Sequence, residues 1–408
     1  MEMKSRVFTA LAAVTVAVAA CGGGAATTAP ATSAPATTAP ATSAPSSAPA
    51  SASASGAASA APSTGAVDWK TATSAGAGGM DAVCAAGKAE GTVNLIATPP
   101  DWANYGQMIT DFTTKTGIKV QSDQPDAGSQ DEINAAKQLA GTGRQPDIFD
   151  LGTAVALANT AMYAPYQVAT WKDIPAANKE ATGLWTNNYT GFMTIGYDTS
   201  LGTITKVADL ADAKYKGKVA LNGDPTKTGA GFNGVVLTAL ANGGSADNIQ
   251  PGIDFMKKLS ASGNLLPVDP APATIASGQT PIVIDWSYNN GPQIAVLGPK
   301  GITWGVVVPS DAAPIAAYYN SAINKDAAHP AAARCWMEYA FSDAGQNTWL
   351  KGFALPVRLA AMQTAGTTDK AAFAALNPPT TTPVMLTAAQ TDAAKALLTA
   401  QWTFITIK

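Results

Sequence analysis

The sequence predicts an α/β protein made of two lobes, and two observations support this prediction. Apolar runs rich in β-branched residues alternate with segments of helical spacing through most of the chain. This alternation is typical of sheets whose strands are joined by crossover helices. Residues 68–408 also form a stretch that is long enough for two lobes, each with its own core.

The expected elements follow one another with short Gly- or Pro-containing breaks between them. In chain order we expect a helix at 81–91, a strand at 92–98, a helix at 105–117, a strand at 118–123, a helix at 131–143, a strand at 146–152, a helix at 154–163, strands at 189–200 and 217–225, helices at 228–244 and 252–263, strands at 280–290 and 301–310, and helices at 331–352 and 387–402.

The N-terminal segment is different in composition. Lys4 and Arg6 precede a short apolar run, as in a signal peptide over residues 1–20, and "VAAC" resembles the bacterial lipobox. Cys21 would then carry the lipid that anchors the protein to the outer face of the cell membrane. Residues 21–67 are mostly Ala, Thr, Ser, Pro and Gly, a composition typical of a disordered tether. The alternative is an ordinary cleaved signal followed by a chance cysteine.

Charge and cysteine content narrow the functional classes. Charged residues make up only 13% of the chain and the formal net charge is −3, so the sequence has no electrostatic footprint for nucleic acid. Outside Cys21 the cysteines are Cys84 and Cys335, and an even pair in an oxidising compartment predicts a disulfide. Two separate buried thiols are the alternative.

Acidic and aromatic residues gather where predicted strands end. The segments that leave these strands read "PPDWANY", "LGTAV", "GDPTKTGAG" and "DWSYNN", and two of them contain the pair Asp-Trp. Ligands of open α/β sheets bind at the carboxyl ends of the strands. These four segments are therefore the expected walls of a binding cleft.

The ordered set of segments resembles extracellular solute-binding proteins of ABC importers, with the type II periplasmic-binding-protein fold. The resemblance rests on "AAGKAEGTVNL", "TGIKV", "QPDIFDLG", "GFMTIGYDTS", "KYKGKVALNGDP", "NSAINKDAAHPAAARCWMEYAFSDAGQ" and "FALPVR". Similar family members bind polyamines, ferric iron, thiamine or phosphonates.

The resemblance implies two lobes, each a mostly parallel sheet flanked by helices. It places the first lobe at 68–195 and 317–408, the latter with the C-terminal helices, and the second lobe at 196–316. Two crossing segments, near Gly191–Tyr197 and Ala316–Ser321, would join the lobes and allow hinge closure. It also implies a monomer without a cofactor, whose partners are a small-molecule ligand and membrane permease subunits.

The resemblance assigns the cleft walls to ligand contact. Asp285 and Trp286 match the acid and aromatic that polyamine binders place on the ligand, with Tyr288 beside them. The alternative is that Asp285 caps a turn and Trp286 packs between lobes. Asp101, Trp102 and Tyr105 follow the first strand, where Asp101 could instead cap the next helix.

Other candidates favour different ligands. Asp224 and Thr228 precede a helix whose N-terminus suits an anion such as a phosphonate, although simple capping is the alternative. Thr153 could donate a neutral hydrogen bond. Tyr318 and Tyr319 form an adjacent pair like that of ferric-iron binders, but in a different register, so hinge packing is the alternative and we expect no bound metal.

The sequence therefore predicts a receptor for a polyamine-like organic cation. It has no HExxH, no GxSxG, no P-loop and no cysteine–histidine pair, and His329, its single histidine, is expected at the surface. We therefore expect that this protein is not an enzyme. A surface hydrolase with paired carboxylates, and an adhesion or sensor module without a ligand, are the alternatives from other classes.

Overall fold

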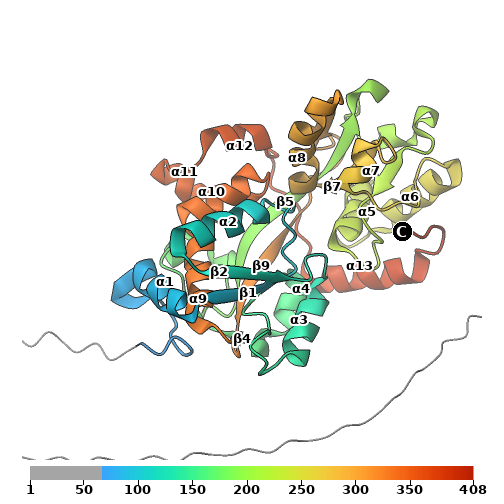
Figure 1. The fold of residues 1–408 in the computed structure, drawn as a ribbon. Helices are drawn as coiled ribbons and strands as arrows, with labels where there is room; N and C mark the ends of the chain where they lie inside the picture. Colours follow the sequence, from blue (N-terminus) through green and yellow to red (C-terminus); the bar gives the residue numbers. More distant parts are fainter. Residues whose placement is uncertain (1–66, 408) are drawn as a thin grey trace, which may run out of the picture. The chain divides into compact units, whose positions relative to one another are not determined.

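The structure, a computed structural model, describes residues 67–407 (Figure 1). The expected signal peptide, the lipidated Cys21 and nearly all of the expected tether lie outside the described residues. Within them, no helix has both the length and the apolar character needed to cross a bilayer.

The strands form a two-stranded sheet, β1–β2, and a larger sheet with the order β3-β9-β5-β7-β6, in which β4 pairs with β9 and both β8 and β10 pair with β5. Their bounds are β1 Thr92–Ile96, β2 Lys119–Asp123, β3 Ile148–Gly152, β4 Tyr163–Ala164, β5 Thr186–Asp198, β6 Val219–Leu221, β7 Ile282–Trp286, β8 Trp304–Val307, β9 Ala316–Asn324 and β10 Leu355–Pro356.

Helices surround these strands. The α-helices are α1 Gly79–Glu90, α2 Tyr105–Thr116, α3 Ser129–Gln138, α4 Thr153–Ala158, α5 Gly229–Ala241, α6 Gln250–Ser262, α7 Pro272–Ala276, α8 Ser287–Leu297, α9 Pro330–Ala340, α10 Asp343–Lys351, α11 Leu359–Ala365, α12 Lys370–Leu376 and α13 Ala388–Gln401.

The long strand β5 belongs to both lobes. Its first half pairs with β9 and β10, and its second half pairs with β7 and β8. In Figure 1 it runs between the first lobe, which contains β1–β4, β9 and β10, and the second lobe, which contains β6–β8. The two-lobed α/β fold that the sequence predicted is therefore confirmed.

The strand pairing differs from the expectation of mostly parallel sheets. β1–β2 and β6–β7 are parallel, but β5 and β9 run antiparallel to their neighbours. The reason is that β5 and β9 are return passes between the lobes, so they enter each sheet against the direction of the crossover-connected strands.

Three expected elements are different in the structure. The single helix expected at 331–352 is two helices, because Ser342 caps a new one and its Oγ accepts from the Gly345 amide at 3.2 Å. The helix expected at 154–163 ends at Ala158. The strand expected at 280–290 ends at Trp286 and continues as α8, which has Pro292 inside it.

In the first lobe, α1 is covalently joined to α9. A disulfide joins Cys84 of α1 to Cys335 of α9, with the Cα atoms 4.9 Å apart, so the pair expected from the sequence is present. The two helices are also in close contact, since a Cβ on Gly87 would lie 2.7 Å from the Cα of Ala332.

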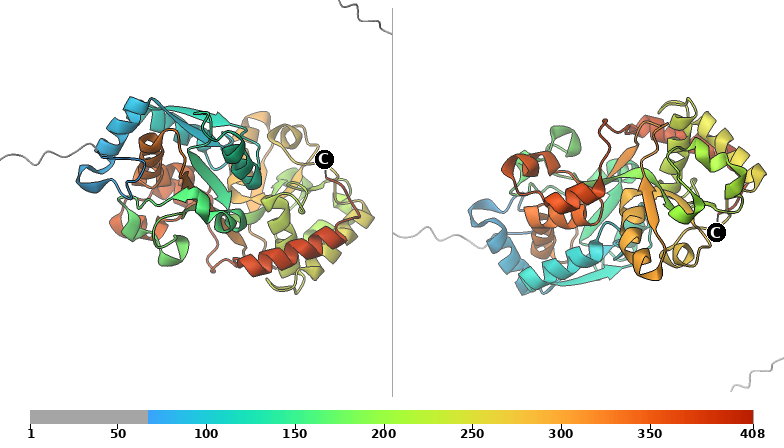
Figure 2. Two further views of the ribbon diagram at one scale, coloured as in Figure 1. Left: turned by 90° about the horizontal axis from the view of Figure 1, so that it is seen from below. Right: turned by 90° about the horizontal axis from the view of Figure 1, so that it is seen from above.

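The last helix lies on the second lobe. α13 packs against α6 and also contacts α4. Both views in Figure 2 keep α13, drawn in red, alongside the yellow-green helices of the second lobe. The sequence had grouped residues 317–408 with the first lobe, and the lobe boundaries proposed from the sequence stay a prediction.

Candidate functional site

Asp285 lies at the carboxyl end of β7, two residues before α8 begins. It is 4% exposed. Its Oδ1 accepts from the Trp286 amide at 2.7 Å and from Asn289 Nδ2 at 3.1 Å, and its Oδ2 accepts from Asn222 Nδ2 at 2.6 Å. Burial raises the pKa of Asp285 to about 7, although these three hydrogen bonds oppose the shift.

Asp150 is a second buried acid, in the middle of β3 in the first lobe. The Tyr105 hydroxyl donates to its Oδ2 at 2.7 Å, and Asn188 Nδ2 donates to its Oδ1 at 2.6 Å. Burial raises the pKa of Asp150 to about 6, against the effect of these hydrogen bonds. Two buried carboxyl groups, one from a strand of each lobe, are therefore poised to change charge near neutral pH.

A third buried acid, Glu132 of α3, lies behind Asp150. Its Oε2 accepts from the Asp150 amide at 2.8 Å, and its Oε1 is buried without a hydrogen-bond partner. Burial, and then the charge on Asp150, raise the pKa of Glu132 well above its usual range. Burial therefore favours the protonated, uncharged form of Glu132, whose carboxyl group holds the backbone of β3.

None of these three acids has a basic partner. The ion pairs found between residues 67 and 407 all involve other carboxylates. Tyr319 is close enough to feel both aspartates, because the charges of Asp150 and Asp285 act with burial to raise its pKa. The junction of the lobes is thus a region of negative potential without a counter-ion.

Aromatic rings fill the space around these acids. We call this set the aromatic cluster, and its members are Trp102, Tyr105, Tyr189, Trp286, Tyr288, Tyr319 and Trp349.

Tyr288 is at the centre of the aromatic cluster. Its ring centroid lies 5.9 Å from that of Trp102, 6.0 Å from that of Trp286 and 5.8 Å from that of Tyr189. Trp102 follows β1 in the first lobe, so its contact with Tyr288 of α8 joins the two lobes. Gly191 of β5 makes room for this ring, since a Cβ there would lie 2.5 Å from Tyr288 Cε1.

Three polar groups of the aromatic cluster have no partner. Trp286 Nε1, Trp349 Nε1 and the Tyr288 hydroxyl are all buried and make no hydrogen bond of normal geometry. A buried polar group without a partner is costly, so each is a place where a bound molecule can add a favourable contact.

The loop after β1 contributes less than the sequence suggested. Asp101 is exposed and is not part of the aromatic cluster. It does not cap α2 either, because that helix begins at Tyr105 and its N-cap residue is Asn104, in a left-handed conformation. Trp102 reaches Tyr288, and Tyr105 is buried with its hydroxyl on Asp150.

The polar side chains of the segment before α5 make contacts within that segment and with the start of α5. Thr228 is the N-cap, and its Oγ1 accepts from the Gly231 amide at 3.2 Å. Asp224 accepts from the Thr226 hydroxyl at 2.6 Å and lies 3.3 Å from Lys227 Nζ. These are the capping contacts that the sequence left as the alternative to anion binding.

Thr153 lies beside the aromatic cluster but is also engaged. Its hydroxyl donates to the Tyr318 carbonyl at 3.2 Å and accepts from Asn320 Nδ2 at the same distance. Because Gly152 pairs with Tyr319 across β3 and β9, Thr153 marks the edge of the cluster.

Sequence reasoning missed Asp150 and Trp349, and it considered Tyr189 only as a loop residue that could donate a neutral hydrogen bond. Asp150 was inside "QPDIFDLG", a segment used for the resemblance, and its position near the end of a predicted strand was an available signal. Tyr189 and Trp349 come from β5 and α10, which meet the strand ends only through tertiary packing.

Other kinds of site are not evident in the described part of the chain. No group of three or more His, Cys, Asp or Glu residues between 67 and 407 is placed to hold a metal ion. Two surface cavities, one beside α3 and one under α13, lie away from the aromatic cluster.

A family model described as "Bacterial extracellular solute-binding protein" matches residues 147–378, more than half of the chain. The chain belongs to this family. It is therefore the substrate-binding component of an ABC importer and works outside the cytoplasm. Among curated protein sequences none matches this chain.

Solved structures show the same fold at low identity. Iron-bound HitA from Pseudomonas aeruginosa is 19% identical, with a TM-score of 0.55 over 77% of this chain and 99% of its own. A protein from Listeria monocytogenes, assigned to a spermidine/putrescine ABC transporter, is 14% identical, with a TM-score of 0.58 over 77% of this chain and 99% of its own.

A third structure, AfuA from Actinobacillus pleuropneumoniae with bound fructose-6-phosphate, is 18% identical and has a TM-score of 0.50 over 66% of this chain and 85% of its own. Of these three proteins, one holds iron, one is assigned to a spermidine/putrescine transporter and one holds fructose-6-phosphate. The shared fold therefore leaves the solute of this protein to be argued from its own residues.

Proposed function

We propose that this solute-binding protein captures a small organic cation with amine groups, such as a polyamine, between its lobes. The observation that carries the proposal is the pair of buried acids on strands of the two lobes, Asp150 and Asp285, which have only neutral hydrogen-bond partners. A cation that enters would supply the charge that both acids lack and would favour their ionised forms.

The aromatic cluster supports the same class of solute. An ammonium group over an indole or phenol ring gains about 0.5–2 kcal/mol, most when water is excluded. Trp102 and Trp286 both contact the ring of Tyr288, three residues after Asp285 in the chain, and the charges of both acids act on Tyr319. Methylene groups of a polyamine would pack on the same rings.

The other candidates from the sequence have secondary places in this proposal. Tyr105 would hold Asp150 in position through its hydroxyl, and Thr153 would border the solute. Asp101 is available only at the rim. Asp224 and Thr228 would keep the loop before α5 in shape, because their polar atoms already have partners.

Calorimetry tests the proposal directly. We expect heat of binding with putrescine or spermidine, and none with an aminophosphonate. Asp285→Asn should weaken amine binding by at least about 30-fold, because truncating one partner of a buried charge pair costs about 2–5 kcal/mol. Asp254→Asn, the same change at an exposed position on α6, serves as the control. Unchanged amine affinity in Asp285→Asn would refute the proposal.

Ferric iron is the second candidate, and one observation favours it. The hydroxyl of Tyr288 is buried without a partner and lies beside Tyr319, near the charge of Asp285. Phenolate and carboxylate oxygens are hard ligands that suit a trivalent ion. Iron binding through these tyrosines would give a visible charge-transfer absorption, which Tyr288→Phe and Tyr319→Phe would remove. A colourless mixture with ferric citrate excludes this candidate.

We also propose that a lipid on Cys21 holds the protein at the outer face of the membrane. The support is the "VAAC" sequence and the Ala-, Thr-, Ser- and Pro-rich segment that follows it. Cys21→Ser should move the protein from the membrane fraction to the medium. Equal retention of both forms on the membrane would contradict the anchor.

A further inference from the structure

The chain passes between the lobes three times, once more than the sequence suggested. β5 is the first passage, and residues 308–316, from the end of β8 into β9, are the second. After α12, which packs on α10 in the first lobe, residues 377–387 lead to α13 on the second lobe. We propose that residues 377–407 act as a strap that restrains the opening of the two lobes.

Near its N-terminal end, the strap is hydrogen-bonded to the second passage. The Val384 amide donates to the Pro314 carbonyl at 2.7 Å, and the Ala316 amide donates to the Val384 carbonyl at 3.0 Å. These two bonds flank Ile315, which is fully buried. Residue 384 is therefore paired with the chain at the point where β9 begins, which is where a hinge motion of the lobes would be centred.

The far end of the strap is fastened to α6. Gln401 and Gln250 exchange hydrogen bonds through their side-chain amides, at 2.6 Å and 3.0 Å. Lys257 Nζ also donates to Gln401 Oε1 at 3.0 Å. Apolar burial accompanies these bonds, since Leu398 of α13 is fully buried and Trp402 is 8% exposed.

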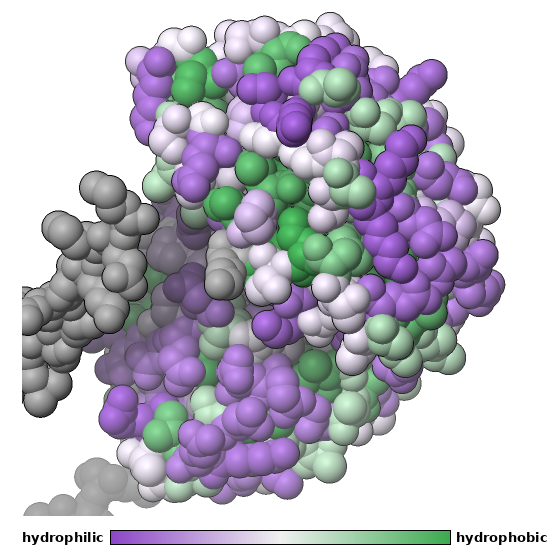
Figure 3. Space-filling view, turned by 90° about the vertical axis from the view of Figure 1, so that its right-hand side faces the viewer, coloured by the Kyte–Doolittle hydropathy of each residue, from purple (hydrophilic) through white to green (hydrophobic). Residues whose placement is uncertain are grey.

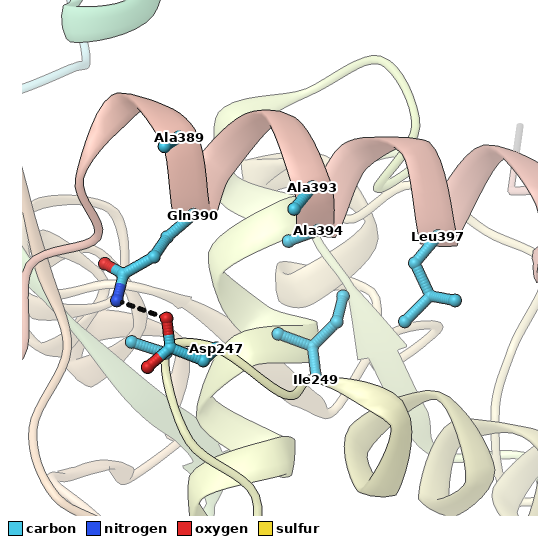
Figure 4. A pocket seen from close by; sticks show the side chains of 8 residues that line it. Asp247, Ile249, Ala389, Gln390, Ala393, Ala394 and Leu397 are labelled. Atoms are coloured by element: carbon cyan, nitrogen blue, oxygen red, sulfur yellow. Dashed lines mark hydrogen bonds between the residues drawn. The ribbon is translucent and has the colours of Figure 1, made fainter.

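The middle of the strap is seated less firmly. A cavity of about 230 Å³ lies under α13, lined mainly by Ile249, Ala393, Ala394 and Leu397. Figure 4 shows these side chains on both sides of the cavity, with Gln390 Nε2 bonded to Asp247 Oδ1 at 2.8 Å at one end. Because small alanines face the cavity, α13 loses few van der Waals contacts if it lifts here.

The side of the molecule that carries α13 has a mixed surface. Figure 3 shows apolar residues gathered near the middle of this side, with hydrophilic residues around them. The strap is thus a surface layer that remains in place through its two ends and a modest apolar contact. Its restraint can be weakened without removing a core element.

The restraint follows from the contacts that α13 makes in both lobes. α13 packs on α6 of the second lobe and touches α4 of the first lobe, while Trp102 and Tyr288 are in contact across the junction. Opening would separate α4 from α13 or pull α13 off α6. Each costs contacts that exist in this closed form, so the strap shifts the equilibrium towards closure. This inference does not depend on which solute is bound.

Distance measurements between the lobes test the strap. Spin labels on Lys137→Cys in α3 and Lys258→Cys in α6, in the full chain with Cys21→Ser, report opening by pulsed electron paramagnetic resonance. Both positions are exposed. In the solute-free protein we expect one narrow distance, and in Gln390→Ala/Gln401→Ala a second, longer distance in at least about a tenth of the molecules.

The matched control is Thr399→Ala on the same helix. Thr399 is exposed and bonds only to the Lys395 carbonyl within α13, so this variant should keep the single narrow distance. The proposal would be overturned if hydrogen exchange showed that α13 is detached in the double variant while the distances between the labels stayed those of the control.

A stabilising variant gives an independent readout if the loosened one folds poorly. Ala393→Leu fills part of the cavity under α13 and should slow hydrogen exchange of the Ala316 and Val384 amides several-fold, since a better-seated strap opens less often. Faster or equal exchange at both amides would also overturn the proposal. Amine calorimetry is not involved, so failure of the solute assignment would leave this result untouched.

Discussion

Two aspartates, one just before β3 and one in the middle of it, are buried to a similar degree but have different partners. Asp147, just before the strand, is fully buried, and His329 Nδ1 lies 2.8 Å from its Oδ2. It also accepts from the amides of Asn94 and His329. Asp150, three residues later, receives only the neutral donors of Tyr105 and Asn188.

This difference separates a structural acid from a site acid. The Asp147 carboxylate has an ionisable partner that can carry the opposite charge, so its charge is matched within the protein. Asp150 has none, and burial holds its pKa at about 6. Burial alone therefore does not identify a functional carboxylate in this fold. A missing counter-charge is the better indicator where the acid still ionises near neutral pH, as at Asp150, and not where burial favours the protonated form, as at Glu132.

The largest effect should come from removing Asp147, the aspartate whose charge is matched by His329. Asp147→Ala leaves two buried amides and His329 without their acceptor, which should lower the free energy of unfolding by about 3–5 kcal/mol. Urea denaturation at pH 7 measures this loss, and calorimetry should find unchanged solute affinity in the folded protein. If the free energy of unfolding fell by less than about 1 kcal/mol, the distinction between Asp147 and Asp150 would not hold.

The opposite effect on stability is expected at Asp150, which has no partner of opposite charge. Asp150→Asn keeps the shape of the side chain and should raise the free energy of unfolding by about 1–2 kcal/mol at pH 8, with solute binding reduced. The folded state keeps the Asp150 proton up to about pH 6, whereas the unfolded chain releases it near pH 4. Stability of the native protein therefore falls as the pH rises between these values.

The gain from Asp150→Asn should accordingly disappear at pH 4. Urea titrations at pH 4 and pH 8 measure both values. A variant that is less stable than the native protein at pH 8 would show that the carboxylate contributes to folding after all.

The third expectation sharpens the same contrast through solute binding. Asp285, whose pKa burial raises to about 7, must lose its proton when a cation binds. Amine affinity should therefore fall about tenfold from pH 8 to pH 6, with protons released on binding. Calorimetry in buffers of different ionisation enthalpy counts these protons. Affinity that is independent of pH would mean that Asp285 is already ionised in the empty protein.

The smallest effect concerns His329. Its hydrogen bond to Asp147 raises its pKa, so its contribution to stability is fully present below pH 6.5 and is lost as the pH rises through the folded-state pKa. Because the imidazole is partly exposed, His329→Asn should cost under about 1 kcal/mol at pH 6, and less at pH 9. Equal costs at both pH values would indicate packing rather than charge.

The sequence predicted the fold more fully than the site. Periodicity and turn residues were sufficient for the order of most elements and for the strand-end position of Asp285, Trp286 and Tyr288. Periodicity carries no signal for the antiparallel return of β5 and β9, because strands look alike in either direction.

The site was predicted only in part for a related reason. Asp101 and Asp224 looked equal to Asp285 by residue type and by their place after strands, but local contacts decide otherwise. The ring of Tyr189 meets those of Tyr288 and Trp349 through packing between distant segments. Such contacts have no local pattern that a single sequence displays.

The disulfide between Cys84 and Cys335 has a consequence for a protein exposed outside the cell. It closes a loop over a sequence separation of 251 residues, which contains β1 to β9 and therefore most of both lobes. A protease that cuts one exposed turn inside this loop leaves two fragments that are still covalently joined. The nicked receptor would not be shed in pieces until the bond was reduced.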